Sequence, residues 1–162
     1  MAAAAQRIAF LTLLGISLCA GVYSVRPQAV ISQPGGCGPL SLYALCQCLG
    51  VATSPDRITT LSGGDNPLTS FVELQQAAQQ LGLEAQGLAL TPAELRRTQP
   101  LGILHVDGGH FVAIVCYEHD GLRIANPVTR GRTDQEVWPY ANLAGRWDGR
   151  ILVVAKTSQM HR

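Results

Sequence analysis

Cys37, His110 and Asn126 are the residues of this chain whose types and surroundings best suit nucleophilic chemistry. Cys37 follows two glycines and precedes Gly38-Pro39, where a helix is expected to begin. The free amides and the dipole of a helix N-terminus lower the pKa of a thiol and so favour the thiolate. An average Cys is a small buried core residue, but a Cys at a glycine-flanked helix start indicates a nucleophile.

His110 and Asn126 supply the two other groups that a thiol nucleophile needs. His110 begins a predicted strand directly after the turn 107–109, and a His beside a thiol acts as its general base. Asn126 follows the next predicted strand, so both residues are expected near the open end of one hairpin. There the amide of Asn126 would hold the imidazole and set its tautomer. Taken alone, His110 would be an ordinary strand-end His, and Asn126-Pro127 an ordinary turn.

Other residues that could carry chemistry favour structural interpretations. Cys46 and Cys48 lie two apart in a predicted helix and therefore point to different faces, which argues against a shared metal. His105 lies within an apolar run and is predicted to be a structural His with a partner. Gly63-Gly64 lacks the Lys and Ser/Thr of a phosphate-binding loop. The sequence therefore implies neither a metal nor a cofactor.

The elements that must position these residues change in type along the chain. Caps, prolines and apolar periodicity predict helices over about 38–49, 54–62, 71–82 and 92–97, with a strand at 83–90 between the last two. Beyond residue 100, short β-branched runs separated by Asp-Gly turns predict an antiparallel sheet with strands at 101–106, 111–117, 122–125 and 151–154. Helices followed by a sheet define an α+β fold class.

The first 26 residues form a separate unit. The stretch 8–25 holds no charged residue and is bounded by Arg7 and Arg26. Its length is at the lower limit for crossing a bilayer, and the same pattern fits a secretory signal. We predict a hydrophobic N-terminal helix that is an uncleaved anchor or a cleaved signal peptide, with lipidation at Cys19 as a less favoured alternative. Residues 1–26 are then a signal peptide or membrane anchor, and the rest of the chain is membrane-anchored or exported, on a side that the two balanced arginines leave open.

Composition limits the function of the remaining domain, residues 27–162. The 162-residue chain carries 12 Lys and Arg against 11 Asp and Glu. A nucleic-acid partner needs a basic surface to neutralise phosphates, so this class of partner is excluded.

Together these motifs resemble the double-glycine leader peptidases, a papain-like family of bacteriocin-processing cysteine peptidases. The family has a Gln before Cys-Gly-Pro-x-x-Leu, which here reads Gln33 and then CGPLSL. It continues with His-Phe-Val, here from His110, then with Asp-Pro or Asn-Pro, here Asn126-Pro127, and with a late Trp-x-Gly, here from Trp147.

The resemblance implies a role for each matched residue. Cys37 would be the nucleophile, His110 the general base and then the general acid, and Asn126 the group that orients the imidazole where the family often has Asp. Gln33 would donate to the oxyanion, although it lies closer to the Cys than the family's Gln usually does. The implied substrate is a peptide or protein, such as a leader peptide cleaved after Gly-Gly. Many family members are fused to a transporter, so this chain is expected to be a stand-alone version that works beside a separate export transporter.

Three other interpretations fit the same sequence. Papain-like scaffolds also support amidases and acyltransferases, and the fold does not choose between these reactions. A second alternative is a non-catalytic domain that binds peptides in the same groove. A third is an anchored structural domain in which Cys37 is merely buried. Thiol reactivity separates the last case from the enzymes.

Overall fold

A computed structural model describes residues 36–64, 69–128 and 132–157 of the chain. In chain order its elements are α2 (Cys37–Cys48), α3 (Pro55–Leu61), α4 (Phe71–Gln80), β1 (Leu83–Ala89), α5 (Pro92–Thr98), β2 (Gly102–Val106), β3 (His110–Tyr117), β4 (Gly121–Val128), β5 (Arg132–Pro139), the 3₁₀ helix η1 (Tyr140–Leu143) and β6 (Trp147–Lys156).

Local sequence explains where the helices begin. In α4 the hydroxyl of Ser70 accepts from the backbone N–H of Glu73, whose carboxylate accepts from the backbone N–H of Ser70. Thr91 and Glu94 make the same reciprocal capping box at the start of α5, as the sequence predicts. Such caps satisfy backbone donors that have no partner inside the helix.

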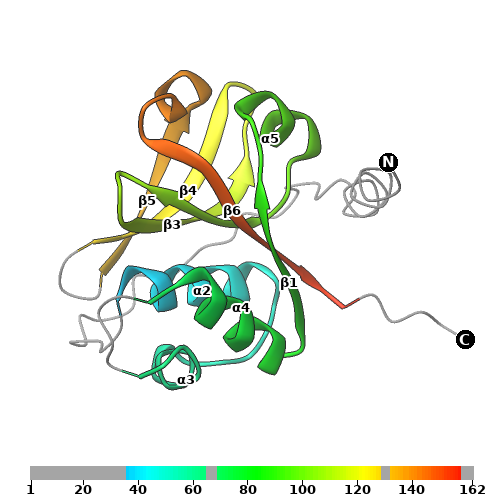
Figure 1. Cartoon of the computed structure of the whole chain (residues 1–162), viewed down its shortest axis with the longest axis vertical. Helices are drawn as coiled ribbons and strands as arrows, with labels where there is room; N and C mark the ends of the chain where they lie inside the picture. The colour runs from blue at the N-terminus through cyan, green and yellow to red at the C-terminus, as the bar shows by residue number, and fades with distance from the viewer. Residues whose placement is uncertain (1–35, 65–68, 129–131, 158–162) are drawn as a thin grey trace, which may run out of the picture.

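The strands form one antiparallel sheet in the order β1-β6-β2-β3-β4-β5. Helices α2, α3 and α4 lie together on one side of this sheet, and α5 lies on the other (Figure 1). Residues alternate between the two faces along each strand. In β6, Leu152 faces the core under α2 to α4, whereas Ile151 and Val153 face the second core, which holds both tryptophans.

Helix α2 is the element that joins the helical layer to the middle of the sheet. It packs on β3 and also contacts β2 and β4. A Cβ atom at Gly38 would lie 3.2 Å from the Leu74 side chain and 3.4 Å from that of Phe111. Glycine at this position therefore lets the first turn of α2 come close to both α4 and β3.

The α+β fold class is confirmed, and so are the predicted helices, within a residue or two at each end. Strand β5 has no counterpart among the predicted elements. The predicted hydrophobic helix lies outside the described residues. Among the helices that are described, none combines the length and the apolar character that crossing a membrane requires.

Candidate active site

Cys37 is the first residue of α2, as predicted, and is partly buried. Its neighbour Gly36 has extended backbone and caps the helix without any side-chain hydrogen bond. The first turn contains no acidic residue, and Pro39 has no N–H to offer. The start of the helix therefore directs its free amides toward the Cys37 sulfur, which accepts a hydrogen bond from the backbone N–H of Gly38.

Ser41, one turn further along α2, fastens this helix to the strand that carries His110. Its buried hydroxyl donates to the backbone carbonyl of Phe111 at 3.1 Å. Because Phe111 directly follows His110, this bond fixes the distance between the segments that hold Cys37 and His110.

His110 is the first residue of β3 and follows a tight turn from β2. Val106 pairs with His110 across the turn, and Asp107 and Gly108 both have positive φ angles, of 51° and 74°. Two successive positive φ angles are what a type I′ turn requires, and they explain the Asp-Gly sequence. The turn thus sets where His110 leaves the end of the hairpin.

The imidazole of His110 lies between Cys37 and Asn126. Its Nε2 donates to Oδ1 of Asn126 at 2.8 Å, and its side chain also hydrogen-bonds with that of Cys37. Since Nε2 is engaged by the amide, Nδ1 is the ring nitrogen that is left for the sulfur. Three of the four predicted residues therefore come together, whereas Gln33 lies outside the described residues.

The pKa values of Cys37 and His110 are shifted in opposite directions. Burial raises the pKa of the Cys37 thiol. This effect is outweighed by hydrogen bonds from His110 and from the backbone N–H groups of Phe111 and Gly38, together with the charge of His110. The pKa of Cys37 is therefore below its usual value. The hydrogen bond with Cys37 raises the pKa of His110; burial opposes this shift, and Asn126 and the charges of Cys37 and Asp107 add to it. Opposite shifts favour a thiolate beside an imidazolium.

The two other described thiols for which a pKa shift is resolved behave differently. Burial raises the pKa of Cys46 to about 11 and also raises that of Cys48. Both lie in α2 with Cys37, and no basic side chain contributes to either shift. A lowered thiol pKa is therefore specific to the start of the helix.

Two residues that the sequence did not predict, Glu136 and Trp138, form a hydrogen-bonded chain with the side chain of Asn126. Its Nδ2 donates to Glu136 Oε1 at 2.7 Å, and Trp138 Nε1 donates to Glu136 Oε2 at 2.8 Å. Both residues lie on β5, the strand that was not predicted. A signal was present only in Val137 and Trp138, since residues 132–136 of the strand are all polar.

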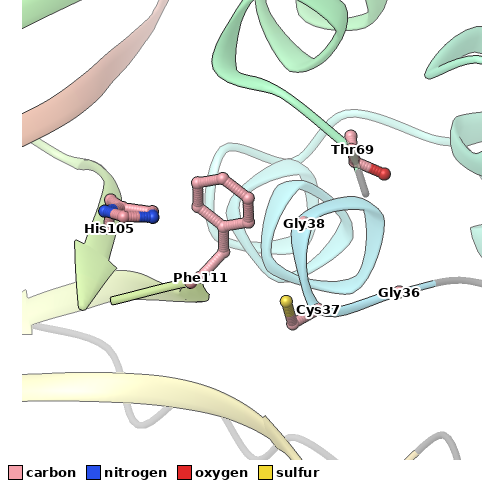
Figure 2. A pocket seen from close by; sticks show the side chains of 7 residues that line it. Gly36, Cys37, Gly38, Thr69, His105 and Phe111 are labelled. Atoms are coloured by element: carbon pink, nitrogen blue, oxygen red, sulfur yellow. The ribbon is translucent and has the colours of Figure 1, made fainter. Parts of the chain in front are cut away.

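A cavity of about 200 Å³ adjoins Cys37. Its lining includes Gly36, Thr69 and Gly109, and one side is formed by the rings of Phe111 and His105, which are tilted by 59° with their centroids 5.3 Å apart. Figure 2 shows the Phe111 ring between His105 and the start of α2. His105 has a partner, as predicted: its Nδ1 lies 2.6 Å from Oδ2 of Asp148.

In the described part of the chain, no three His, Cys, Asp or Glu side chains are grouped so as to hold a metal ion. The chemistry available at this site is that of a thiol, an imidazole and helix-end amides.

Solved structures share this fold. A double-glycine motif protease from an AMS/PCAT transporter, solved with its leader peptide, superposes with a TM-score of 0.66 at 22% identity, over 80% of this chain and 91% of that chain. The peptidase domain of Streptococcus ComA, a bifunctional ABC transporter of a quorum-sensing pathway, gives a TM-score of 0.63 at 19% identity, over 80% and 96% of the two chains. The fold is therefore that of the papain-like double-glycine peptidase domains.

The family follows from the sequence comparison. The model of the Peptidase C39 family matches residues 29–159, which is most of the chain, so the chain belongs to the Peptidase C39 family. The resemblance read from the motifs is confirmed. An uncharacterized protein of Methanothermobacter marburgensis is 26% identical over 132 residues, which cover 80% of this chain and 89% of that protein.

Proposed function

We propose that this chain is a thiol peptidase in which Cys37 is the nucleophile, His110 the general base and acid, and Asn126 the group that orients the imidazole. The observation that carries the proposal is the imidazole of His110, which is hydrogen-bonded to Cys37 on one side and to Asn126 on the other. This is the arrangement in which an enzyme activates a weak nucleophile with an adjacent, oriented base.

The proposed reaction assigns a step to each of these groups and takes Gln33 from the family motif, since it lies outside the described residues. The Cys37 thiolate attacks the peptide carbonyl carbon, and the backbone N–H of Cys37 and the side chain of Gln33 donate to the oxyanion that forms. When the C–N bond breaks, the His110 imidazolium gives its proton to the leaving amine. Water then attacks the thioester while His110 accepts its proton, and the second peptide product leaves as a carboxylate with the thiolate restored.

Small residues around the nucleophile support a substrate with glycine at the cleavage site. Gly36, Gly38 and Gly109 line the cavity beside Cys37, and its remaining lining is dominated by the Phe111 and His105 rings. Two aromatic rings that face these glycines favour a substrate without bulky side chains just before the scissile bond. Together with the leader peptide bound to the double-glycine motif protease, this supports cleavage after Gly-Gly in a leader peptide.

The setting of the enzyme belongs to the same proposal. Residues 1–26 act as a signal peptide or membrane anchor, and residues 27–162 as the peptidase domain. The uncharged stretch 8–25 supports this division. The domain would then serve peptides that a separate export transporter carries.

The test is the rate at which iodoacetamide labels Cys37 as a function of pH, measured in the full chain by mass spectrometry of the Cys37 peptide. We expect labelling to persist well below pH 8, since an ordinary thiol titrates near 8.5. His110→Ala should restore ordinary thiol behaviour. The matched control is His119→Ala, because the His119 side chain is exposed and its ion-pair partner among the described residues is its neighbour Asp120.

Products separate the possible reactions. Incubation with Gly-Gly peptides should yield two product peptides, of which the N-terminal one ends in a new free carboxylate. His110→Ala should lower the rate of this cleavage about 100-fold or more. Transfer of the acyl group to an added amine would instead indicate an acyltransferase. Ordinary thiol titration that is unchanged in His110→Ala would contradict every enzyme proposal and leave a peptide-binding domain.

A further inference from the structure

Glu136 occupies a position that none of the catalytic steps uses. Its carboxylate accepts two hydrogen bonds, one at each oxygen: Asn126 Nδ2 lies 2.7 Å from Oε1, and Trp138 Nε1 lies 2.8 Å from Oε2. Asn126 pairs with Asp134 in the β4–β5 register, so Glu136 is its diagonal neighbour on the same sheet face. The Glu136 carboxylate is therefore part of the site. It contacts the Nδ2 end of the Asn126 amide, whereas His110 contacts the Oδ1 end.

The chemistry of an amide makes this contact informative. One end of the Asn126 side chain accepts hydrogen bonds, and the other end only donates. A carboxylate only accepts, so Glu136 can bond only to the Nδ2 end. Rotating the amide by half a turn would bring two acceptors together at Glu136 and two donors together at His110. Glu136 thereby selects the orientation in which Oδ1 faces His110.

We propose that Glu136 is a positioning residue that fixes the amide of Asn126 and through it keeps the proton on Nε2 of His110. With Nε2 protonated, Nδ1 is free to take the thiol proton, which the proposed peptidase function requires. The inference rests on that function but concerns a different contact. The contact with the Glu136 carboxylate strengthens Asn126 Oδ1 as a hydrogen-bond acceptor, although the Asn126 side chain is itself neutral.

Glu136 is itself held in place from the opposite side. The guanidinium carbon of Arg146 lies 3.8 Å from the centre of the Trp138 ring, and Trp138 donates to Glu136. Arg146 also makes two hydrogen bonds to Asp107, at 3.0 and 2.7 Å, in the turn before His110. The carboxylate is thus fixed to the same turn that places the imidazole.

The test is the titration of His110, followed by NMR of ¹⁵N-labelled imidazole in the full chain. In Glu136→Gln the single amide oxygen can serve only one of the two donors, so Asn126 is released to rotate. We expect the His110 pKa to fall by about one unit and Cys37 labelling at pH 6 to fall about tenfold. The groups facing His110, namely Cys37 on α2, Asp107 in the turn and Asn126 on β4, are unchanged in this variant.

Glu118→Gln is the matched control. Glu118 is another partly buried carboxylate with a side-chain partner, Arg123, but it lies at the far end of the β3–β4 hairpin. This substitution should leave the titration of His110 unchanged.

A double-mutant cycle keeps the inference falsifiable even where Glu136→Gln lowers stability. Asn126→Asp alone places two carboxylates face to face and should destabilise the fold. In the double variant Asn126→Asp with Glu136→Gln, the new carboxylate accepts from both His110 and the Gln amide, and every donor regains an acceptor. We expect the double variant to be more stable than the sum of the two single effects predicts.

The inference and the proposed function fail in different ways. An unchanged His110 titration in folded Glu136→Gln, or additive effects in the cycle, would overturn the role of Glu136. Because NMR reports the imidazole without any turnover, a Glu136-dependent titration in a chain that cleaves no peptide would uphold this role and contradict the peptidase.

Discussion

At the residue scale, the groups around Cys37 lower the pKa of its thiol although the thiol is partly buried. Burial alone would raise its pKa, as it does for Cys46 in the same helix. What separates the two thiols is the imidazole of His110 and the backbone N–H groups of Phe111 on β3 and Gly38 at the helix start. The same contacts that lower one pKa raise the other, so the two groups titrate as a pair.

Asn126→Ala should destabilise the fold by an amount that depends on pH. The hydrogen bond to Asn126 helps to raise the pKa of His110, after the larger effect of Cys37. A raised pKa in the folded state stabilises the fold below the unfolded value of about 6.5, and this stabilisation is lost as pH rises through the folded-state pKa. The difference in unfolding free energy between wild type and variant should therefore be larger at pH 5.5 than at pH 9.

Urea unfolding at these two pH values measures this difference. A hydrogen bond to a charged partner contributes about 1.5–3 kcal/mol, against about 0.5–1.5 kcal/mol for a neutral pair. An equal penalty at pH 5.5 and pH 9 would mean that Asn126 does not distinguish the protonation states of His110.

At the scale of elements, the site depends on how α2 docks on β3. The buried bond from Ser41 to the carbonyl of Phe111 joins them one helical turn from Cys37. Ser41→Ala should lower the free energy of unfolding by about 1–3 kcal/mol, because it leaves a buried carbonyl without its donor. It should also slow Cys37 labelling at pH 6, since the thiol and the imidazole lose their fixed separation.

Ser62→Ala is the matched comparison. Ser62 is equally buried, but its hydroxyl donates to Ile58 within its own helical turn. We expect this variant to lose stability with little change in Cys37 labelling. If both serine variants slowed labelling equally, the effect would be due to general loosening and not to the docking of α2.

The elements that hold Cys37 and His110 could be predicted from the sequence, whereas β5 could not. Capping residues and prolines mark the helix starts, and Asp-Gly turns separate the apolar strands β2, β3 and β4. Strand β5 lies at the edge of the sheet and is mostly polar, so it lacks the apolar alternation that identifies a half-buried strand. Glu136 was missed for the same reason, since only the pairing of β5 with β4 brings it to Asn126.

At the scale of the whole molecule, the sheet separates two cores that should unfold together. Leu152 belongs to the core beneath α2 to α4, whereas Trp138 and Trp147, the only two tryptophans of the chain, lie in the core on the other face. Leu152→Ala should lower the free energy of unfolding by about 2–5 kcal/mol. Because small domains unfold cooperatively, tryptophan fluorescence should report this loss from the opposite face.

The measurement is urea unfolding followed by fluorescence and by far-UV circular dichroism. Coincident midpoints that shift together in the variant are the expected result. A fluorescence transition that stays at its wild-type midpoint while the circular dichroism transition moves would show that the two cores unfold independently.

About half of the domain lies between Cys37 and His110 along the chain. Cys37 leaves the ribosome early, while His110 on β3 follows only after α3, α4, β1, α5 and β2. Until β3 has formed and α2 has docked on it, the thiol has no base beside it and titrates like any free cysteine. The nascent chain therefore carries an ordinary thiol at Cys37, and the pKa of this thiol falls only when the fold is complete.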